Sequence, residues 1–220
     1  MNQKTNKSLG ENPKWRWHEL IVTTKKYFNL EFDIEFTELF YFNYIVPAYT
    51  VDRHYHTLRH VEYMLKHVMD FGVSHKDRCL LKWAIWFHDI IYDSKRTDNE
   101  ERSANMLVDF ATALGFEEED IEVMKWLVLV TTHKGSPQTE LEDIICDLDL
   151  REFVNDRQPL NAVEVRKEYS FLSDEEWNEG RTAFVKSMLD KEYIYHTDEY
   201  RGALEDTARI NLQKELDTIT

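Results

Sequence analysis

Residues 83–92 read WAIWFHDIIY, and this apolar run enclosing a His-Asp pair is the most informative stretch of the chain. Its apolar residues continue the stripe of Leu80 and Leu81 at helical spacing, which points His88 toward the interior. An ionised Asp89 beside it would be costly to bury unless a cation met its charge. A divalent metal ion is the natural candidate for that cation.

The composition predicts helices around one core. The chain has 220 residues with only 6 Gly and 4 Pro, and its mix of 42% hydrophobic and 31% charged residues is typical of a globular protein. Gly and Pro fall between periodic apolar segments, which divides the sequence into about ten helices. We expect the first at Trp15–Phe28 and the fifth at about Asn99–Leu114, with Gly115 as its C-cap. We therefore predict an all-α single domain over 1–220. Within it we expect a flexible 1–13, a metal-site core at about 50–155, and helices of 160–217 packed on that core.

The charge limits the classes of partner. With 42 acidic and 27 basic residues the formal charge is −15, which argues against a broad contact with nucleic acid or with an anionic membrane. Cys79 and Cys146 read as buried free thiols, which fits a reducing compartment. No apolar stretch approaches the roughly 20 residues of a membrane span, and no signal peptide precedes the first helix. We expect a soluble cytoplasmic protein whose oligomeric state the sequence leaves open.

The potential metal ligands lie far apart along the chain. His60 falls in the first turns of a helix that Thr57 would cap, His88 and Asp89 end the next helix, and Asp149 follows 60 residues after Asp89. Imidazole nitrogens mixed with carboxylate oxygens suit Mn, Fe, Co, Ni or Mg better than a thiolate-rich structural zinc site. Such a site has to be assembled by the fold.

The order of these residues resembles the H…HD…D signature of the HD-domain superfamily of metal-dependent phosphohydrolases. More narrowly, residues 55–61 (YHTLRHV), 86–93 (WFHDIIYD) and 98–104 (DNEERSA) look like a bacterial branch of predicted HD phosphohydrolases, and the resemblance continues through 165–169 and 208–212. It implies an HD-type helical bundle that hydrolyses a phosphate ester. It also implies one divalent ion held by two His and two Asp residues, which here are His60, His88, Asp89 and Asp149.

Three positions have rivals. His56 stands one turn before His60 and could be the ligand instead, although we prefer it as a substrate contact. Asp147 competes with Asp149, but the family pattern places the ligand directly before a Leu-Arg pair, which favours Asp149. His133 could reach the substrate or a second metal, or could simply interact with a helix dipole. Because two-metal relatives usually carry additional histidines, one metal ion is favoured.

The proton acceptor is less well defined than the ligands. Asp93 is the first candidate to orient or deprotonate a water molecule, with Glu100 and Glu101 as alternatives. Several nucleotide-cleaving HD enzymes carry Glu three residues after the ligand Asp, where this chain has Tyr92, so the base assignment stays open. Candidate substrate contacts are His56, Arg59, Arg102, Lys134 and Arg166, of which the basic side chains could neutralise phosphoryl oxygens.

The sequence thus predicts a metal-dependent hydrolase of a small phosphorylated metabolite such as a nucleotide, acting through a metal-activated water. Two other classes stay open. One is a non-catalytic module that binds a metal and a nucleotide. The other is a helical interaction protein whose acidic surface meets a basic partner.

Overall fold

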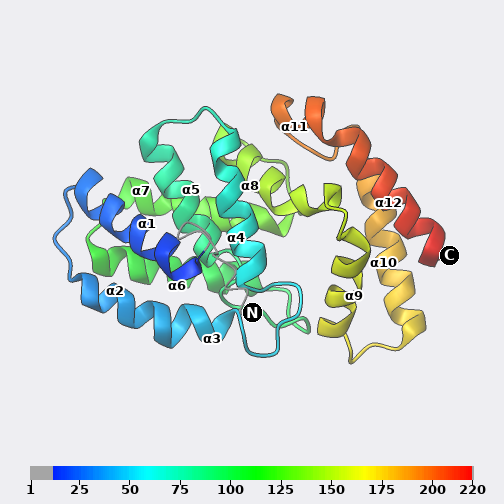
Figure 1. Cartoon of the computed structure of the whole chain (residues 1–220), viewed down its shortest axis with the longest axis horizontal. Helices are drawn as coiled ribbons and strands as arrows, with labels where there is room; N and C mark the ends of the chain where they lie inside the picture. Colours follow the sequence, from blue (N-terminus) through cyan, green and yellow to red (C-terminus); the bar gives the residue numbers. More distant parts are fainter. Residues whose placement is uncertain (1–11, 220) are drawn as a thin grey trace, which may run out of the picture.

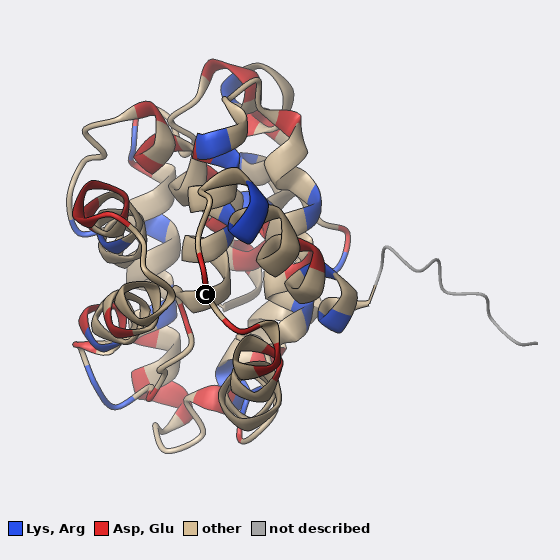
Figure 2. Ribbon diagram, turned by 90° about the vertical axis from the view of Figure 1, so that its left-hand side faces the viewer, with Lys and Arg blue, Asp and Glu red and all other residues tan. Residues whose placement is uncertain are grey.

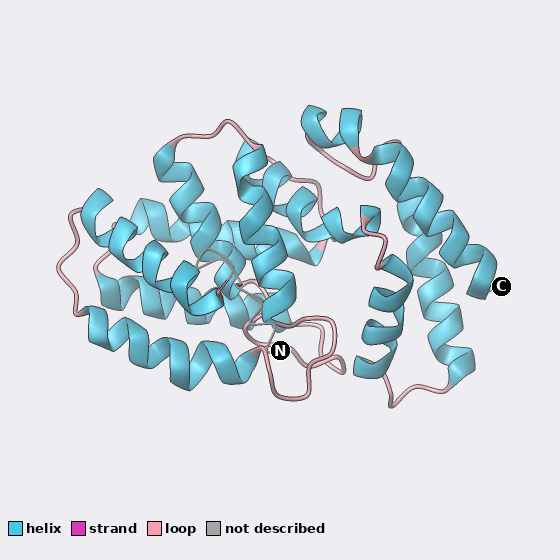
Figure 3. Ribbon diagram, viewed as in Figure 1, coloured by secondary structure: helices cyan, strands magenta, loops and turns pink. Residues whose placement is uncertain are grey.

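The computed structural model describes residues 12–219, and every regular element among them is a helix (Figure 1; Figure 3). The α-helical segments are α1 (Pro13–Tyr27), α2 (Ile34–Phe40), α3 (Val46–Ala48), α4 (Leu58–His67), α5 (His75–Phe87), α6 (Asn99–Leu114), α7 (Glu118–Leu129), α8 (Glu140–Leu150), α9 (Gln158–Glu168), α10 (Asp174–Leu189), α11 (Asp198–Ala203) and α12 (Glu205–Ile219). A π-helical turn, Tyr41–Ile45, joins α2 to α3, and one residue separates α11 from α12. The twelve segments of this described part therefore form ten separate helices, which confirms the all-α prediction.

Polar side chains at the helix ends explain several boundaries. The Asn12 side chain accepts a hydrogen bond from the Lys14 amide, so α1 begins at Pro13, two residues earlier than the sequence suggests. Most of the expected flexible segment, residues 1–11, lies outside the described residues. Helix α6 has the predicted bounds and ends at Gly115, whose φ of 84° is the left-handed conformation of a C-cap.

Helix α5 is the centre of the core. It contacts α1, α4, α6, α7 and α8, and its residues from Trp83 to Phe87 are completely buried. Trp17 of α1 packs edge-on against both Trp83 and Trp86, at 5.5 and 5.4 Å between ring centroids. The apolar run that precedes the His-Asp pair is therefore enclosed on all sides, and it brings His88 to the middle of the molecule.

The helices α9, α10 and α12 form a separate layer on the right of Figure 1, where α10 packs along α12. A 3₁₀ turn, Arg151–Val154, leads from α8 into this layer, and Asn211 of α12 donates a hydrogen bond to the Phe153 carbonyl at 2.9 Å. Acidic and basic residues are interspersed over the face drawn in Figure 2. None of the described helices is long and apolar enough to cross a membrane.

Candidate metal centre

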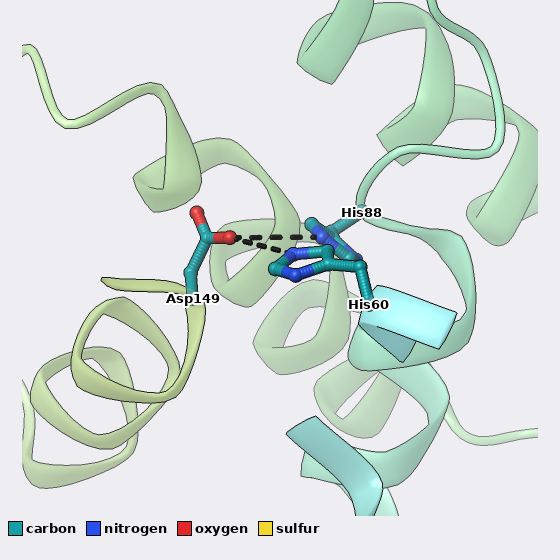
Figure 4. A group of neighbouring side chains, drawn as sticks. All are labelled: His60, His88 and Asp149. Atoms are coloured by element: carbon teal, nitrogen blue, oxygen red, sulfur yellow. Dashed lines mark hydrogen bonds and ion pairs between the residues drawn. The ribbon is translucent and has the colours of Figure 1, made fainter. Parts of the chain in front are cut away.

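Three helix ends bring the predicted ligands together (Figure 4). His60 comes from the first turn of α4, His88 follows the last residue of α5, and Asp149 lies in the last turn of α8. The Asp149 Oδ1 atom lies 3.0 Å from His60 Nε2 and 3.9 Å from His88 Nε2. One donor atom from each residue falls within 4.8 Å of the other two, a spacing that a single ion could bridge. This group is a possible buried His-His-Asp metal site.

His88 carries the most informative atom of the group. Its Nδ1 lies 2.8 Å from the Ile85 carbonyl, so Nδ1 carries a proton, and the neutral form of the ring has its lone pair on Nε2. That Nε2 is buried and makes no hydrogen bond, although Asp89 Oδ2 lies 3.0 Å away. Buried polar atoms are normally hydrogen-bonded, and an imidazole whose other nitrogen is fixed by a carbonyl is the usual arrangement of a metal-binding histidine. The donor set therefore fits a metal ion.

Asp89 lies at the edge of the group. Its Oδ2 is 3.0 Å from His88 Nε2, but it does not belong to the set of donors that lie within 4.8 Å of one another. Its backbone carbonyl accepts a hydrogen bond from Arg53 at 2.9 Å, which fixes the chain just after α5. The structure thus brings together three of the four predicted ligands, and the fourth is adjacent to one of them.

The cluster keeps its carboxylates ionised. Burial alone would raise the pKa of Asp149, but the hydrogen bonds with His133 and His60 hold that pKa well below its usual range. Burial alone would lower the pKa of His60, but the contacts with Asp149 and Glu152 outweigh burial and raise this pKa to about 10. The carboxylates therefore stay negatively charged, and either protonated imidazoles or a bound cation must balance that charge.

Glu152 belongs to this cluster although the sequence reasoning missed it. The carboxylate is buried, with Oε1 3.5 Å from His60 Nδ1 and Oε2 accepting a hydrogen bond from Asn161 at 2.6 Å. It lies three residues after Asp149, on the same face of the continuing helical path. This three-residue spacing from Asp149 is visible in the sequence and could have identified Glu152. The contact places a carboxylate behind His60, where it can orient the ring.

The structure separates the rival residues. Asp147 is buried away from the group and accepts hydrogen bonds from the His196 and Thr197 amides and from the Thr197 hydroxyl, so it holds the start of α11. Asp149, in contrast, lies between His60 and His133, whose Nε2 is 2.9 Å from Asp149 Oδ2. His133 thus lies beside the group rather than remote from it.

His56 is fixed beside the site by Glu168, a second residue that the sequence reasoning missed. Glu168 accepts hydrogen bonds from the backbone amides of residues 54–56 through Oε1, and its Oε2 lies 2.6 Å from His56 Nδ1. The His56 ring packs on Tyr92, with 4.2 Å between centroids. No sequence signal pairs Glu168 with His56, because the two lie 112 residues apart and meet only through packing.

A cavity of about 510 Å³ opens beside the cluster, between the core and the α9–α10 layer. Of the predicted site residues, those that line it are His56, Asp89, Glu100, His133 and Asp149. Its opposite wall comes from α9, α10 and the segment joining them. This volume is typical of a small-molecule site.

Other predicted residues lie outside the cavity lining. Asp93 is exposed and accepts a hydrogen bond from the Lys95 amide, a contact within the loop that follows α5. Glu101, Arg102 and Lys134 are exposed and do not line the cavity.

Two of the predicted cations already have partners. Arg59 bonds Asn161 and Glu164, at 3.2 and 2.7 Å. Arg166 donates to the backbone carbonyls of Tyr169 and Leu172. Neither guanidinium lines the cavity.

Comparisons with protein-family models, with curated proteins and with solved structures found no match. The buried His-His-Asp group and the cavity beside it are therefore the observations that bear on function.

Proposed function

We propose that this protein is a metal-dependent phosphohydrolase of the HD type. One divalent ion, of the Mn, Fe, Co, Ni or Mg kind, would be held by His60, His88 and Asp149, with Asp89 as the fourth ligand. The observation that carries the proposal is the buried His88 Nε2, which makes no hydrogen bond and lies 3.0 Å from Asp89 Oδ2 and 3.9 Å from Asp149 Oδ1. The HD-like order of the same residues in the sequence supports the choice of reaction.

When bound, such an ion supplies a nucleophile by lowering the pKa of water, and it withdraws electrons from a phosphoryl group. The residues of the chain have separate tasks. Glu152 orients the His60 ring, and His133 holds the second oxygen of Asp149. Glu100 and His133 line the cavity, and Glu100 is the predicted proton acceptor that the substrate could reach.

His56 is suited to contact the substrate. Its Nδ1 is bound to Glu168, which leaves Nε2 as the nitrogen available to a ligand, and the residue lines the cavity on the side of Asp89. A phosphoryl oxygen could accept a hydrogen bond from a protonated Nε2 at this position. In this arrangement Glu168 is a positioning residue that acts through His56.

Elemental analysis of untagged protein purified without chelator tests the metal site. We expect about one transition-metal ion per chain in the wild type and less than a tenth of that in His60→Ala and Asp149→Ala. His54→Ala is the matched control, because His54 is exposed in the same segment and contributes only its backbone amide to the fold. Full metal content in His60→Ala and Asp149→Ala, or none in the wild type after incubation with Mn, Fe, Co and Ni, would refute the site.

Phosphate release from small phosphate esters, measured with the metal that binds, tests the reaction. We expect turnover that is lost in Asp149→Ala and retained in His54→Ala. A metal-loaded protein that binds phosphate esters for hours without releasing phosphate would instead be a binding module. A protein that takes up no metal would favour the interaction-protein class.

A further inference from the structure

The wall of the cavity opposite the metal cluster is aromatic. Tyr169 follows the end of α9, and Trp177 and Phe184 lie on one face of α10, seven residues apart. These rings line the same space as Asp89 and Asp149, so one ligand could touch both ends. Flat aromatic walls favour a partner with a flat ring, since stacked rings attract one another beyond the burial of their area.

Two neighbouring side chains hold the ring of Trp177 in place. The Arg166 guanidinium lies over it, with 5.6 Å to the ring centroid, and Tyr169 packs beside it at 5.6 Å between centroids. Arg166 is itself fixed by the Tyr169 and Leu172 carbonyls at 2.7 and 3.0 Å, and it does not line the cavity. This support orders the wall before any ligand binds, which reduces the entropy cost of stacking.

The charges of the lining suit a ligand with little negative charge away from the metal. Five carboxylates line the cavity, and they belong to Asp89, Glu100, Asp149, Glu152 and Glu176. Arg181 is the one Lys or Arg of this lining among the described residues, and it is already paired with Glu215 at 2.6 and 3.2 Å. Gln158 also donates to the Glu215 carboxylate. A chain of several phosphates would therefore lack the basic groups that normally receive it.

Gly180 leaves an opening in the aromatic wall. It lies three residues after Trp177 and four before Phe184 in α10, so the three residues share one face of the helix, and all three line the cavity. A Cβ atom built on Gly180 meets no atom within 4 Å. The space in front of this glycine is therefore free to receive a ligand, and a larger side chain could fill it without a clash.

We infer that the ligand of this cavity is a phosphomonoester with a single phosphate and a flat ring, the chemical class of the nucleoside monophosphates. The phosphate would lie at His60, His88 and Asp149, and the ring would lie on Trp177 in the opening at Gly180. The placement of the phosphate rests on the proposed function. The recognition of the ring rests on the α9–α10 wall alone.

Calorimetric titration of the full-length protein in excess Mn²⁺ tests the inference with a matched pair of ligands. Adenosine 5′-monophosphate and ribose 5-phosphate share the phosphate and the sugar, and they differ only in the ring. We expect the ring to tighten binding at least about tenfold, which is the usual order for one base stacked on an aromatic side chain. Equal affinity for the two ligands, or tighter binding of adenosine 5′-triphosphate than of the monophosphate, would overturn the inference.

Substitutions in the wall locate the effect. Gly180→Leu should reduce the affinity for adenosine 5′-monophosphate at least about tenfold and leave that for ribose 5-phosphate unchanged, while Gly180→Ala should change it less. Gly202→Leu is the matched control, because Gly202 is a helical glycine of α11 outside the cavity lining and is equally unobstructed. Trp177→Ala removes the stacking surface by a second route. Thermal melts check that each variant folds, and unchanged adenosine 5′-monophosphate binding in both Gly180→Leu and Trp177→Ala would contradict the assignment.

Phosphate release from the same two ligands separates this inference from the proposed function. Binding that depends on the ring, without release of phosphate from either ligand, would refute the hydrolase and leave the ring site standing. Release from both ligands at the same kcat/KM, with no effect of Gly180→Leu, would refute the ring site and leave the hydrolase standing.

Discussion

At the scale of single residues, the centre depends on carboxylates placed behind imidazoles. Glu152 lies 3.5 Å from His60 Nδ1 and is buried with one oxygen that has no hydrogen-bond partner. Burial alone would raise its pKa, but the contact with His60 outweighs burial and the pKa is lowered, so the group is ionised at neutral pH. An ionised carboxylate behind a ligating imidazole increases the basicity of that ligand and fixes its orientation.

Replacing Glu152 should therefore weaken metal binding without removing a ligand. We expect Glu152→Gln to bind Mn²⁺ or Co²⁺ about 10- to 100-fold more weakly than the wild type, measured by competition with a fluorescent chelator. Glu164→Gln is the matched control. Glu152 and Glu164 both pair with Arg59, at 3.6 and 2.7 Å, but only Glu152 is a partner of His60. Wild-type affinity in Glu152→Gln, or an equal loss in Glu164→Gln, would remove Glu152 from the site.

At the scale of elements, the ends of the helices decide where the functional side chains lie. Helix α10, which carries the aromatic wall, begins with a capping box in which Ser173 and Glu176 bond each other's backbone amides. Helix α6, whose first turn contributes Glu100 to the cavity, ends at Gly115. These local signals are readable in the sequence because a cap involves residues only a few positions apart.

The end of α6 gives a test of this local chemistry. Gly115 has a φ of 84°, and a Cβ atom there would meet no atom within 4 Å, so Gly115→Ala adds backbone strain and no clash. We expect a loss of about 1 kcal/mol in the free energy of unfolding, measured by urea denaturation. The control Gly202→Ala, inside α11, should be neutral or stabilising by up to about 1 kcal/mol. A stabilised Gly115→Ala variant would be inconsistent with the left-handed cap.

At the scale of the whole molecule, Glu168 ties the C-terminal layer to the core. This residue ends α9, and its carboxylate accepts hydrogen bonds from the three amides of residues 54–56, which precede α4 and its candidate ligand His60. Ser94, in the loop after α5, adds a hydrogen bond from its hydroxyl to the Glu168 carbonyl at 2.7 Å. One residue therefore connects both halves of the cavity.

This connection should make the stability depend on pH. Burial alone would raise the pKa of Glu168, but the bonds with His56 and with the backbone amides of His54 and Tyr55 lower it to about 2, against 4.5 for an ordinary Glu. Because the folded-state pKa is depressed, the stabilisation is complete above about pH 4.5 and is lost as the pH falls toward 2. It amounts to about 3 kcal/mol when complete.

Urea denaturation of wild type and Glu168→Gln between pH 7 and pH 2 measures this contribution. We expect the difference in the free energy of unfolding between the two proteins to be constant above about pH 5 and to shrink as the pH falls toward 2. Glu164→Gln removes another carboxylate of the same helix, and its difference from the wild type should show no comparable dependence on pH. A difference that stays constant down to pH 2 would mean that Glu168 is not an ionised clamp.

The sequence by itself determined the helical class, the position of α6 with its cap, and the inward direction of His88. These properties follow from periodicity and from capping, which are local along the chain. The sequence also selected the residues of the candidate metal group, because His60, His88 and Asp149 fit a spacing pattern.

Only the tertiary structure decided what surrounds that group. It placed Asp147 at the start of α11, set Glu152 behind His60, brought Glu168 to His56 and left Asp93 at the surface. The aromatic wall of α10 likewise faces the His-His-Asp group only once the layer of α9, α10 and α12 has packed beside the core. The physical reason is that these contacts join segments far apart in sequence. Their partners are chosen by the packing of whole helices, which no local pattern records.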